Sequence, residues 1–249
     1  MSKVVFITGA SNGIGKGLAE EFAKRGYQLA LAARTMAALN NVKDSIVGQL
    51  PATKILCYQL DVTQAENVAA VIDQAGKGFG RLDIVIANAG IGGGGSVGSG
   101  KLAQDIAVIA TNVIGAIATI DAAMARFKQQ GSGQIVAISS VAAFRGMPGA
   151  ASYCASKAAL STYMQSLETE TINTNIHTTT FFPGYIDTDI NNMLKSRPFL
   201  ISVAKAAPMM VNMIENKVKR STVPPYPWRF VGQVLKVLPN RFFAGKKMA

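Results

Sequence analysis

The chain has 249 residues, of which 49% are hydrophobic and 16% charged, and this composition predicts one globular α/β domain with a sizeable core rather than a disordered or fibrous protein. Its formal net charge of +11 is concentrated in residues 190–249, where Glu215 is the single acidic side chain; no nucleic-acid-reading motif accompanies this charge, so we expect no nucleic-acid partner. Two cysteines without metal-ligand spacing and the lone His177 leave almost nothing from which a disulfide scaffold, a metal site or a Ser–His site could be built.

The first apolar run, Lys3–Thr8, predicts a buried strand. The stretch before it is too short for a signal peptide, so we expect a cytoplasmic protein. Residues 9–15 read GASNGIG and lead into a helical pattern that ends at Gly26. Such a glycine turn lets backbone N–H groups and a helix N-terminus approach a pyrophosphate, although its spacing differs from the commoner dinucleotide fingerprint and an ordinary tight turn is the alternative.

The second strand, Gln28–Ala33, ends about 20 residues after these glycines, where it would lie beside an adenosine ribose. An acidic residue there would bind the ribose 2′-hydroxyl of NAD, but the chain has Arg34. A guanidinium suits the additional phosphate of NADP. We therefore predict NADP in preference to NAD; the alternative is that Arg34 packs on the adenine ring or points into water.

Two further strands follow, at residues 54–60 and 82–87, each separated from the previous strand by a helical stretch. The third ends at Asp61–Val62, where Asp61 either contacts the adenine amino group or caps the next helix. The fourth ends at residues 88–90, Asn-Ala-Gly. Strands that alternate with helices predict a doubly wound parallel sheet, which binds ligands beyond the carboxyl ends of its strands.

Residues 92–100 include six glycines, and this loop either flexes over the site or is a passive surface connection. Leu102–Gln129 predicts one long apolar helix with Asn112 near its middle, which either satisfies a helix kink or orders a water molecule. This helix and the one that follows Ala150 have broad faces of small residues. Such faces suit tight pairing, so we predict a homodimer or homotetramer.

Three polar side chains converge on the same edge of the predicted sheet. The apolar run that ends at Ser139 predicts a strand that would deliver the Ser140 hydroxyl to this edge. Tyr153 and Lys157 are four residues apart and lie on one face of a helix. A neighbouring ammonium favours the phenolate, so we expect Lys157 to bring the pKa of Tyr153 down from about 10 and to make it a usable general acid or base.

The sixth strand, residues 178–182, leaves the sheet through a turn that begins at Pro183–Gly184 and would reach the nicotinamide end of a dinucleotide. Residues 1–189 therefore form the predicted dinucleotide-binding and catalytic core. Residues 190–222 hold several methionines, among them Met193, Met209, Met210 and Met213, and predict a helical substrate lid of the same domain.

Residues 223–249 form a basic tail. Within it, residues 228–238 predict an amphipathic helix with apolar positions 228, 231, 234, 235 and 238 on one side. The helix is too short to span a bilayer but suits a membrane interface, which would give peripheral membrane contact through residues 226–249. The alternatives are that this side packs on its own subunit or on a neighbouring one, and that the charge only solvates the surface.

These motifs occur in an order that resembles the short-chain dehydrogenases/reductases, over about residues 3–190. The resemblance implies a single-domain Rossmann fold with about seven parallel strands flanked by helices, and a nicotinamide cofactor. It also implies that Ser140 holds the substrate oxygen, that Tyr153 passes the proton, and that Lys157 binds the nicotinamide ribose and lowers the pKa of the tyrosine. Asn112 would hold a water molecule that connects the lysine to solvent.

The positions that match the family's cofactor contacts are Gly9, Ser11, Asn12, Gly13, Ile14, Gly15, Arg34, Asp61, Val62, Asn88, Ala89, Gly90, Tyr153, Lys157, Pro183, Gly184, Ile186 and Thr188. The predicted function is that of an NADP-dependent oxidoreductase, which transfers hydride between the cofactor and a carbonyl or secondary alcohol of a hydrophobic, lipid-like or acyl, substrate. The alternative is a non-catalytic nucleotide-binding scaffold or sensor on the same fold. The presence of both Tyr153 and Lys157 favours the enzyme.

Overall fold

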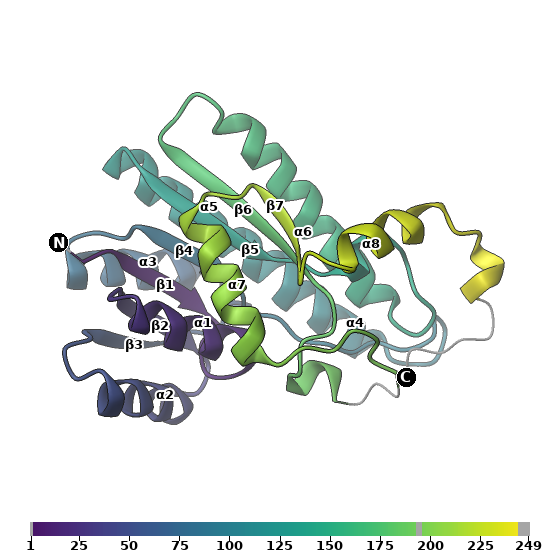
Figure 1. Cartoon of the computed structure of the whole chain (residues 1–249), viewed down its shortest axis with the longest axis horizontal. Coiled ribbons are helices and arrows are strands. Elements are labelled where there is room, and N and C mark those ends of the chain that lie inside the picture. The colour runs from purple at the N-terminus through teal and green to yellow at the C-terminus, as the bar shows by residue number, and fades with distance from the viewer. Residues whose placement is uncertain (1, 193–195, 244–249) are drawn as a thin grey trace.

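The computed structural model describes residues 2–192 and 196–243. Its centre is one parallel sheet of seven strands in the order β3-β2-β1-β4-β5-β6-β7 (Figure 1). This topology confirms the predicted doubly wound Rossmann fold with helices on both faces of the sheet. The strands are β1 Val4–Thr8, β2 Gln28–Ala33, β3 Ile55–Gln59, β4 Ile84–Ala87, β5 Gly133–Ile138, β6 Ile176–Pro183 and β7 Arg220–Val223.

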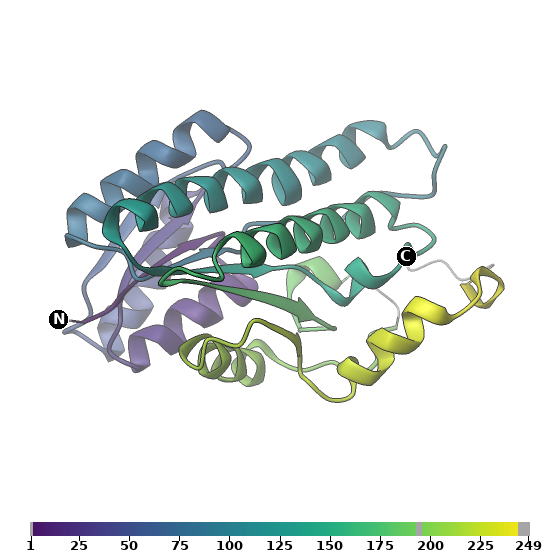
Figure 2. The same cartoon turned by 90° about the horizontal axis from the view of Figure 1, so that it is seen from above.

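Helices cover the sheet on both sides, which is why strands such as β1 are apolar along their whole length (Figure 2). One face packs against α1, α2 and α7, and the other against α3, α5 and α6. The bounds of the helices are α1 Gly13–Lys24, α2 Met36–Gln49, α3 Ala65–Phe79, α4 Leu102–Ile109, α5 Gly115–Gln130, α6 Ala151–Glu170, α7 Val203–Glu215 and α8 Trp228–Val237.

The strand order places a crevice between the loops that follow β1 and β4. The chain builds the sheet in one direction from β1 to β3 and then in the other from β4 to β7, so these two loops diverge at the switch point. They start close together: a Cβ on Gly9, whose φ is +65°, would lie 2.8 Å from the Cα of Ala89. Glycine at position 9 is therefore required by the fold as well as by any bound phosphate.

The predicted single helix over residues 102–129 is interrupted. A π-helical turn, η1 Ala110–Ile114, separates α4 from α5 and contains the buried Asn112. Such turns insert one extra residue and often occur at functional sites. By length and composition alone, Leu102–Gln130 could cross a membrane, and its residues Ile120 and Phe127 are buried against the sheet.

Much of the predicted substrate lid, residues 190–222, is part of the core and of the sheet. Helix α7 is a core helix: Met210 and Ile214 are fully buried under the sheet. Val203 fills the space beside Gly17 of α1, where a Cβ would lie only 2.2 Å from its side chain. Residues 220–223 then form the edge strand β7, and the predicted lid residues Met193 and Leu194 lie outside the described residues.

The predicted tail helix is confirmed as α8, but its apolar side faces the protein. Trp228 is only 4% exposed, and Val231, Val234, Leu235 and Leu238 are half-buried. The apolar side that was predicted to meet a membrane therefore packs on its own subunit, which was the alternative prediction. Residues 244–249 of the tail lie outside the described part of the chain.

Adjacent methionines on α7 test its place in the core. We expect Met210→Ala to lower the free energy of unfolding by about 2–4 kcal/mol, because the side chain is fully buried. Met209, which is 39% exposed, is the matched control, and its alanine variant should change stability by less than about 0.5 kcal/mol. Urea denaturation measures both. Equal stability of the two variants would contradict a core role for α7.

Candidate active site

The predicted site residues gather at the carboxyl edge of the sheet, although they come from distant parts of the sequence. The glycine turn follows β1, residues 88–90 follow β4, Ser140 follows β5, and residues 184–188 follow β6. Tyr153 and Lys157 approach the same edge from the first turns of α6. A ligand in this crevice would therefore meet all of these segments at once.

Asn88 joins the loop after β4 to the glycine turn. Its Nδ2 donates to the carbonyl oxygens of Thr8, at 2.9 Å, and Gly9, at 3.1 Å. A Cβ on Gly15 would lie 2.3 Å from the carbonyl oxygen of Gly9, so any side chain there would break the turn. The backbone can thus pass close to a bound group, which fits a nicotinamide dinucleotide.

The N-terminus of α1 suits the phosphates of such a cofactor. No side chain caps this helix, and its first turn carries no acidic residue. Its free N–H groups can therefore donate hydrogen bonds to an anion. Thr188 lies beside Gly13, where a Cβ would approach its methyl group to 3.3 Å. The predicted cofactor residues Gly13 and Thr188 therefore lie close together, and Ser11 and Ile14 are half-buried in the same turn.

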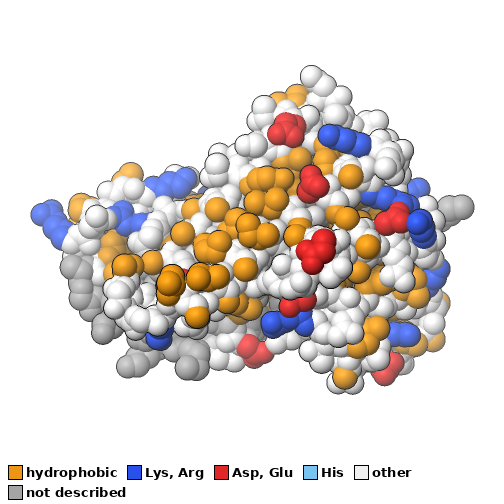
Figure 3. Space-filling model, turned by 180° about the vertical axis from the view of Figure 1, so that it is seen from behind, with side chains coloured by type: hydrophobic (Ala, Val, Ile, Leu, Met, Phe, Trp, Pro, Cys, Tyr) orange, Lys and Arg blue, Asp and Glu red, His pale blue; other side chains and the backbone are white. Residues whose placement is uncertain are grey.

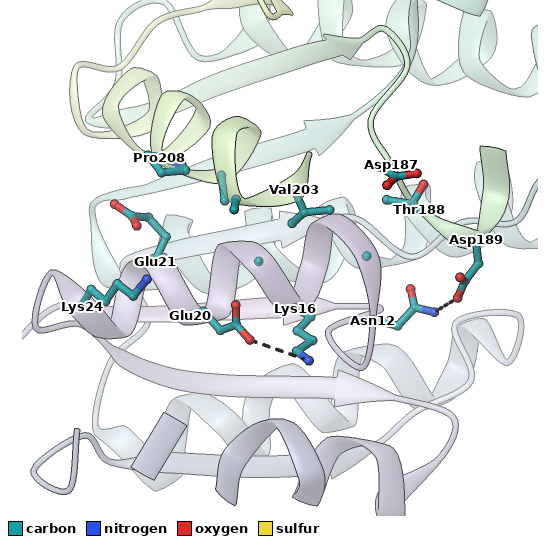
Figure 4. A pocket seen from close by; sticks show the side chains of 14 residues that line it. Asn12, Lys16, Glu20, Glu21, Lys24, Asp187, Thr188, Asp189, Val203 and Pro208 are labelled. Atoms are coloured by element: carbon teal, nitrogen blue, oxygen red, sulfur yellow. Dashed lines mark hydrogen bonds and ion pairs between the residues drawn. The ribbon is translucent and has the colours of Figure 1, made fainter. Parts of the chain in front are cut away.

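A pocket of about 370 Å³ opens next to this turn, between α1 and α7 (Figure 4). At one end, Asn12 donates from Nδ2 to Oδ2 of Asp189 at 2.5 Å. This hydrogen bond links the glycine turn to the segment after β6. Only this end of the pocket, at Asn12, Gly13 and Thr188, coincides with the predicted cofactor contacts.

Arg34 and Asp61 follow β2 and β3, the side of the sheet where the adenosine was predicted to lie. Arg34 is exposed directly after β2 and, within the described residues, forms no ion pair. Oδ1 of Asp61 accepts from the backbone N–H of Thr63 at 3.0 Å and from its hydroxyl at 2.8 Å. The Thr63 backbone N–H, with smaller effects from its hydroxyl and from Arg34, holds the pKa of Asp61 below its usual range. Asp61 thus organises the turn before α3.

Two of the predicted cofactor residues have buried side chains. Val62 packs on Gly115, where a Cβ would lie 2.6 Å from its methyl group. Ile186 is 1% exposed and forms an isolated parallel bridge with Ile201. The side chains of these two residues therefore pack within the protein.

Ser140 is held where β5 gives way to the short 3-10 turn η2, Val141–Phe144. Its Oγ accepts from the backbone N–H of Ala142 at 3.1 Å, which caps this turn. The hydroxyl also lies 3.5 Å from the carbonyl oxygen of Pro183, at the end of β6. Ser140 is therefore fixed between two strand ends.

Lys157 is buried, at 5% exposure, and donates from Nζ to the carbonyl oxygen of Ile138 at 2.9 Å. Its Nζ lies 5.8 Å from the ring centre of Tyr153. Gly90 lies beside both groups: a Cβ there would be in ordinary contact with Nζ, at 3.5 Å, and in tight contact with Oδ1 of Asn112, at 3.2 Å. The lysine, the tyrosine and the asparagine thus face one small space beside Gly90.

The side chain of Asn112 is fully engaged within the protein. Oδ1 accepts from the backbone N–H of Ile91 at 2.8 Å, and Nδ2 donates to the carbonyl oxygen of Ile91 at 3.0 Å and to Oγ of Ser156 at 3.1 Å. These bonds tie the π-helical turn to the loop after β4 and to α6. They agree with the structural alternative for Asn112, in which its amide satisfies the distorted helix.

Burial controls the ionisation of the site. It raises the pKa of Tyr153, and the hydrogen bond with Ser140 only partly opposes this. Burial also lowers the pKa of Lys157, to about 8. The expected lowering of the tyrosine pKa by the ammonium is therefore not seen, because the lysine is itself desolvated and donates to Ile138.

An aromatic wall that the sequence did not predict borders these residues. The rings of Tyr185 and Phe199 pack edge-on against Trp228, at centroid distances of 5.7 and 5.9 Å. Trp228 lies so close to Gly184 that a Cβ there would be 2.1 Å from its indole nitrogen. Tyr185 is near enough to Tyr153 to contribute to its raised pKa. Sequence spacing could not identify Trp228, because it reaches the site from the tail.

The glycine-rich loop closes over the start of α6. Gly94, with φ +98°, leaves no room for a side chain, since a Cβ would lie 2.6 Å from Oγ of Ser152 and 3.0 Å from Oδ1 of Asp105. Ser152 directly precedes Tyr153. The loop therefore lies against the segment that carries the tyrosine.

Comparisons with known proteins extend over most of the chain. A family model described as short chain dehydrogenase matches residues 3–198. An uncharacterized oxidoreductase of Mycobacterium tuberculosis is 39% identical over 238 residues, 95% of this chain and 94% of that protein. The 11-beta-hydroxysteroid dehydrogenase 1A of Arabidopsis thaliana is 37% identical over 192 residues, which cover 76% of this chain and 53% of that protein.

A solved structure is similar over nearly the same length. It is an alcohol dehydrogenase from the archaeon Thermococcus sibiricus, complexed with 5-hydroxy-NADP, with a TM-score of 0.81 and 25% identity. The match covers 90% of this chain and 96% of that chain. A similar fold is thus found in a protein whose structure was determined with a nicotinamide dinucleotide analogue.

The lowered pKa of Lys157 predicts a pH-dependent stability. Between the folded pKa of about 8 and the unfolded value near 10.4, the unfolded chain binds the additional proton, so the free energy of unfolding should increase as pH rises through this window. From about pH 8 to about pH 9.5 we expect the wild type to gain roughly 2 kcal/mol relative to Lys157→Met. Urea denaturation at both pH values measures this; parallel curves would contradict the lowered pKa.

Proposed function

Because the chain belongs to the short-chain dehydrogenases/reductases, we propose that it is an NADP-dependent oxidoreductase that acts on a carbonyl or secondary alcohol of a hydrophobic substrate. The observation that carries this proposal is the convergence of Ser140, Tyr153 and Lys157 beside an aromatic wall at the carboxyl edge of the sheet. The nicotinamide group, when bound, supplies or accepts the hydride.

The residues of the chain have distinct roles in reduction. As negative charge builds on the carbonyl oxygen, the hydroxyls of Ser140 and Tyr153 donate to it, and Tyr153 transfers its proton. A phenol with the ordinary pKa of about 10 is protonated at neutral pH, and burial raises the pKa of Tyr153 further, which suits a proton donor. The ammonium of Lys157 places a positive charge near the phenolate that remains, and Asn112 holds the loop that borders this space.

The preference for NADP rests on Arg34. Its guanidinium is exposed at the end of β2, where it can bind a phosphate on the adenosine ribose through charge-assisted hydrogen bonds. The nearest carboxylate after β3, Asp61, is already bonded to Thr63. The 5-hydroxy-NADP in the archaeal structure supports the same preference.

The hydrophobic character of the substrate is supported by the wall of the site. Tyr185, Phe199 and Trp228 form one aromatic group, and Phe144 and Phe182 form a second, at a centroid distance of 5.0 Å. An apolar wall with a few polar groups is typical of a site for a lipid-like or acyl molecule. The name of the Arabidopsis relative, a hydroxysteroid dehydrogenase, agrees with this class.

The proposal includes a homodimer or homotetramer. Hydrophobic side chains gather on the face opposite to Figure 1, which carries α3, α5 and α6 (Figure 3). On α4 and η1 the exposed ones are large: Leu102, Ile106, Ile109 and Ile114. A contiguous apolar face of this kind is typical of a subunit interface.

Tyr153→Phe tests the proposed chemistry. It removes the transferable proton and keeps the ring, so turnover should fall by at least about a hundred-fold. NADPH binding, followed by fluorescence, should remain. Tyr185→Phe is the matched control in the same wall and should retain activity. A panel of carbonyls and alcohols, followed by absorbance of the reduced cofactor, supplies the substrate; ordinary turnover in Tyr153→Phe would refute the assignment.

Arg34→Asp tests the preference for NADP. The substitution removes a charge-assisted contact and adds repulsion, so the ratio of kcat/KM with NADPH to that with NADH should fall by at least about tenfold. Arg229→Asp makes the same charge change on α8 and should leave the ratio unaltered. An unaltered ratio in Arg34→Asp would mean that the guanidinium does not face the cofactor.

A further inference from the structure

Helix α8 has a second, outer side that no part of the chain covers among the described residues. The exposed fractions are 70% for Phe230 and 79% for Val237, and Tyr226 and Phe242 beside the helix are also exposed. The helix projects from one end of the molecule (Figures 1 and 2). Phe230 and Val237 define the outer face of α8.

The inner side alone holds the helix in place. Trp228 is buried, and Gly232 packs on Phe144, where a Cβ would lie 2.5 Å from the ring. Arg145, which follows η2, donates to the carbonyl oxygens of Leu235, at 3.2 Å, and Leu238, and to Oδ1 of Asn240. The apolar residues of the outer face are therefore not required for the attachment of α8.

Apolar and basic residues are sorted on this outer side. Phe230 and Val237 are seven residues apart, as are Arg229 and Lys236, so each pair lies along one side of the helix. The two pairs lie about 100° apart around the helix, and the ammonium of Lys236 lies 5.1 Å from the ring centre of Phe144. An apolar stripe beside a basic stripe is typical of a helix that lies in a membrane interface.

The positive charge of residues 216–249 indicates which kind of partner binds the outer face. After Glu215 the sequence contains eight lysines and arginines and no acidic residue. A second copy of the chain, docked through the same face, would bring like charges together, which opposes self-association. An anionic lipid surface offers both the opposite charge and an apolar layer for Phe230 and Val237.

We propose that the outer face of α8 binds the surface of an anionic lipid bilayer. Phe230 and Val237 enter the interface, while Arg229 and Arg241 contact the lipid headgroups. The inner side of the same helix contributes Trp228 to the aromatic wall. Docking therefore brings α8, which carries this part of the wall on its other side, close to the bilayer, where lipid-like molecules are concentrated.

Flotation of the full-length protein with vesicles tests the proposal. We expect flotation with vesicles of phosphatidylcholine and phosphatidylserine, and much weaker flotation with phosphatidylcholine alone or in high salt. Phe230→Ser combined with Val237→Ser should weaken the binding at least about tenfold. Ile172→Ser is the matched control, because Ile172 is 65% exposed just beyond the far end of α6.

The outcomes separate this proposal from the proposed function. The double variant should fold with unaltered stability and keep its NADPH-dependent turnover in vesicle-free buffer, so loss of flotation cannot come from loss of catalysis. Absence of flotation by the wild type, or equal flotation of wild type and double variant, would overturn the proposal. So would a larger oligomer in solution that only the double variant abolishes, since the face would then bind a second copy.

Discussion

The site depends on a buried ammonium with one carbonyl partner. Lys157 donates to the oxygen of Ile138 at the end of β5, and an ammonium removed from water is costly unless its surroundings compensate. Two neighbours of the ammonium are Gly90, which has no side chain, and Asn112. The side-chain amide of Asn112 is hydrogen-bonded to Ile91 and Ser156. The first turns of α6 are thereby joined to the sheet, since Oγ of Ser139 also donates to the carbonyl oxygen of Lys157. Tyr153 is placed by this attachment.

The same burial that makes the charged form of Lys157 energetically costly also shifts the pKa of Tyr153. Burial raises the pKa of Tyr153 and lowers that of Lys157. It therefore favours the neutral form of each side chain. This is the reverse of a surface pair, in which the charge of the lysine would dominate. A phenol that keeps its proton is suited to donate it to a carbonyl oxygen that gains charge, and the nearby Ser140 hydroxyl can share that charge.

Local patterns predicted the sheet well, because a parallel strand covered on both faces is a short apolar run and a glycine turn marks its end. The order of Asn112, Ser140, Tyr153 and Lys157 likewise identified the candidate site. Long-range packing decided what the sequence did not predict. The methionines of α7 resembled a flexible lid, yet Met210 is core because Gly17 lets the helix approach α1. The short strand β7, with its Arg220–Val223 pairing to β6, has no apolar run of its own. The pKa of Tyr153 depends on burial, which spacing cannot indicate.

Helix α8 carries one apolar stripe on its inner side and a second, shorter one on its outer side. Positions 228, 231, 234, 235 and 238 form the obvious apolar stripe, and the fold uses it against η2 and Gly184. Phe230 and Val237 interrupt the polar side of the same helix, where packing in the subunit does not require them. A helix that only covered the site would be expected to carry polar residues there, since exposed aromatic and branched side chains favour association. Phe230 and Val237, which packing in the subunit does not require, are accompanied by Arg229 and Lys236. This combination suits the boundary between charged lipid headgroups and the apolar layer beneath them.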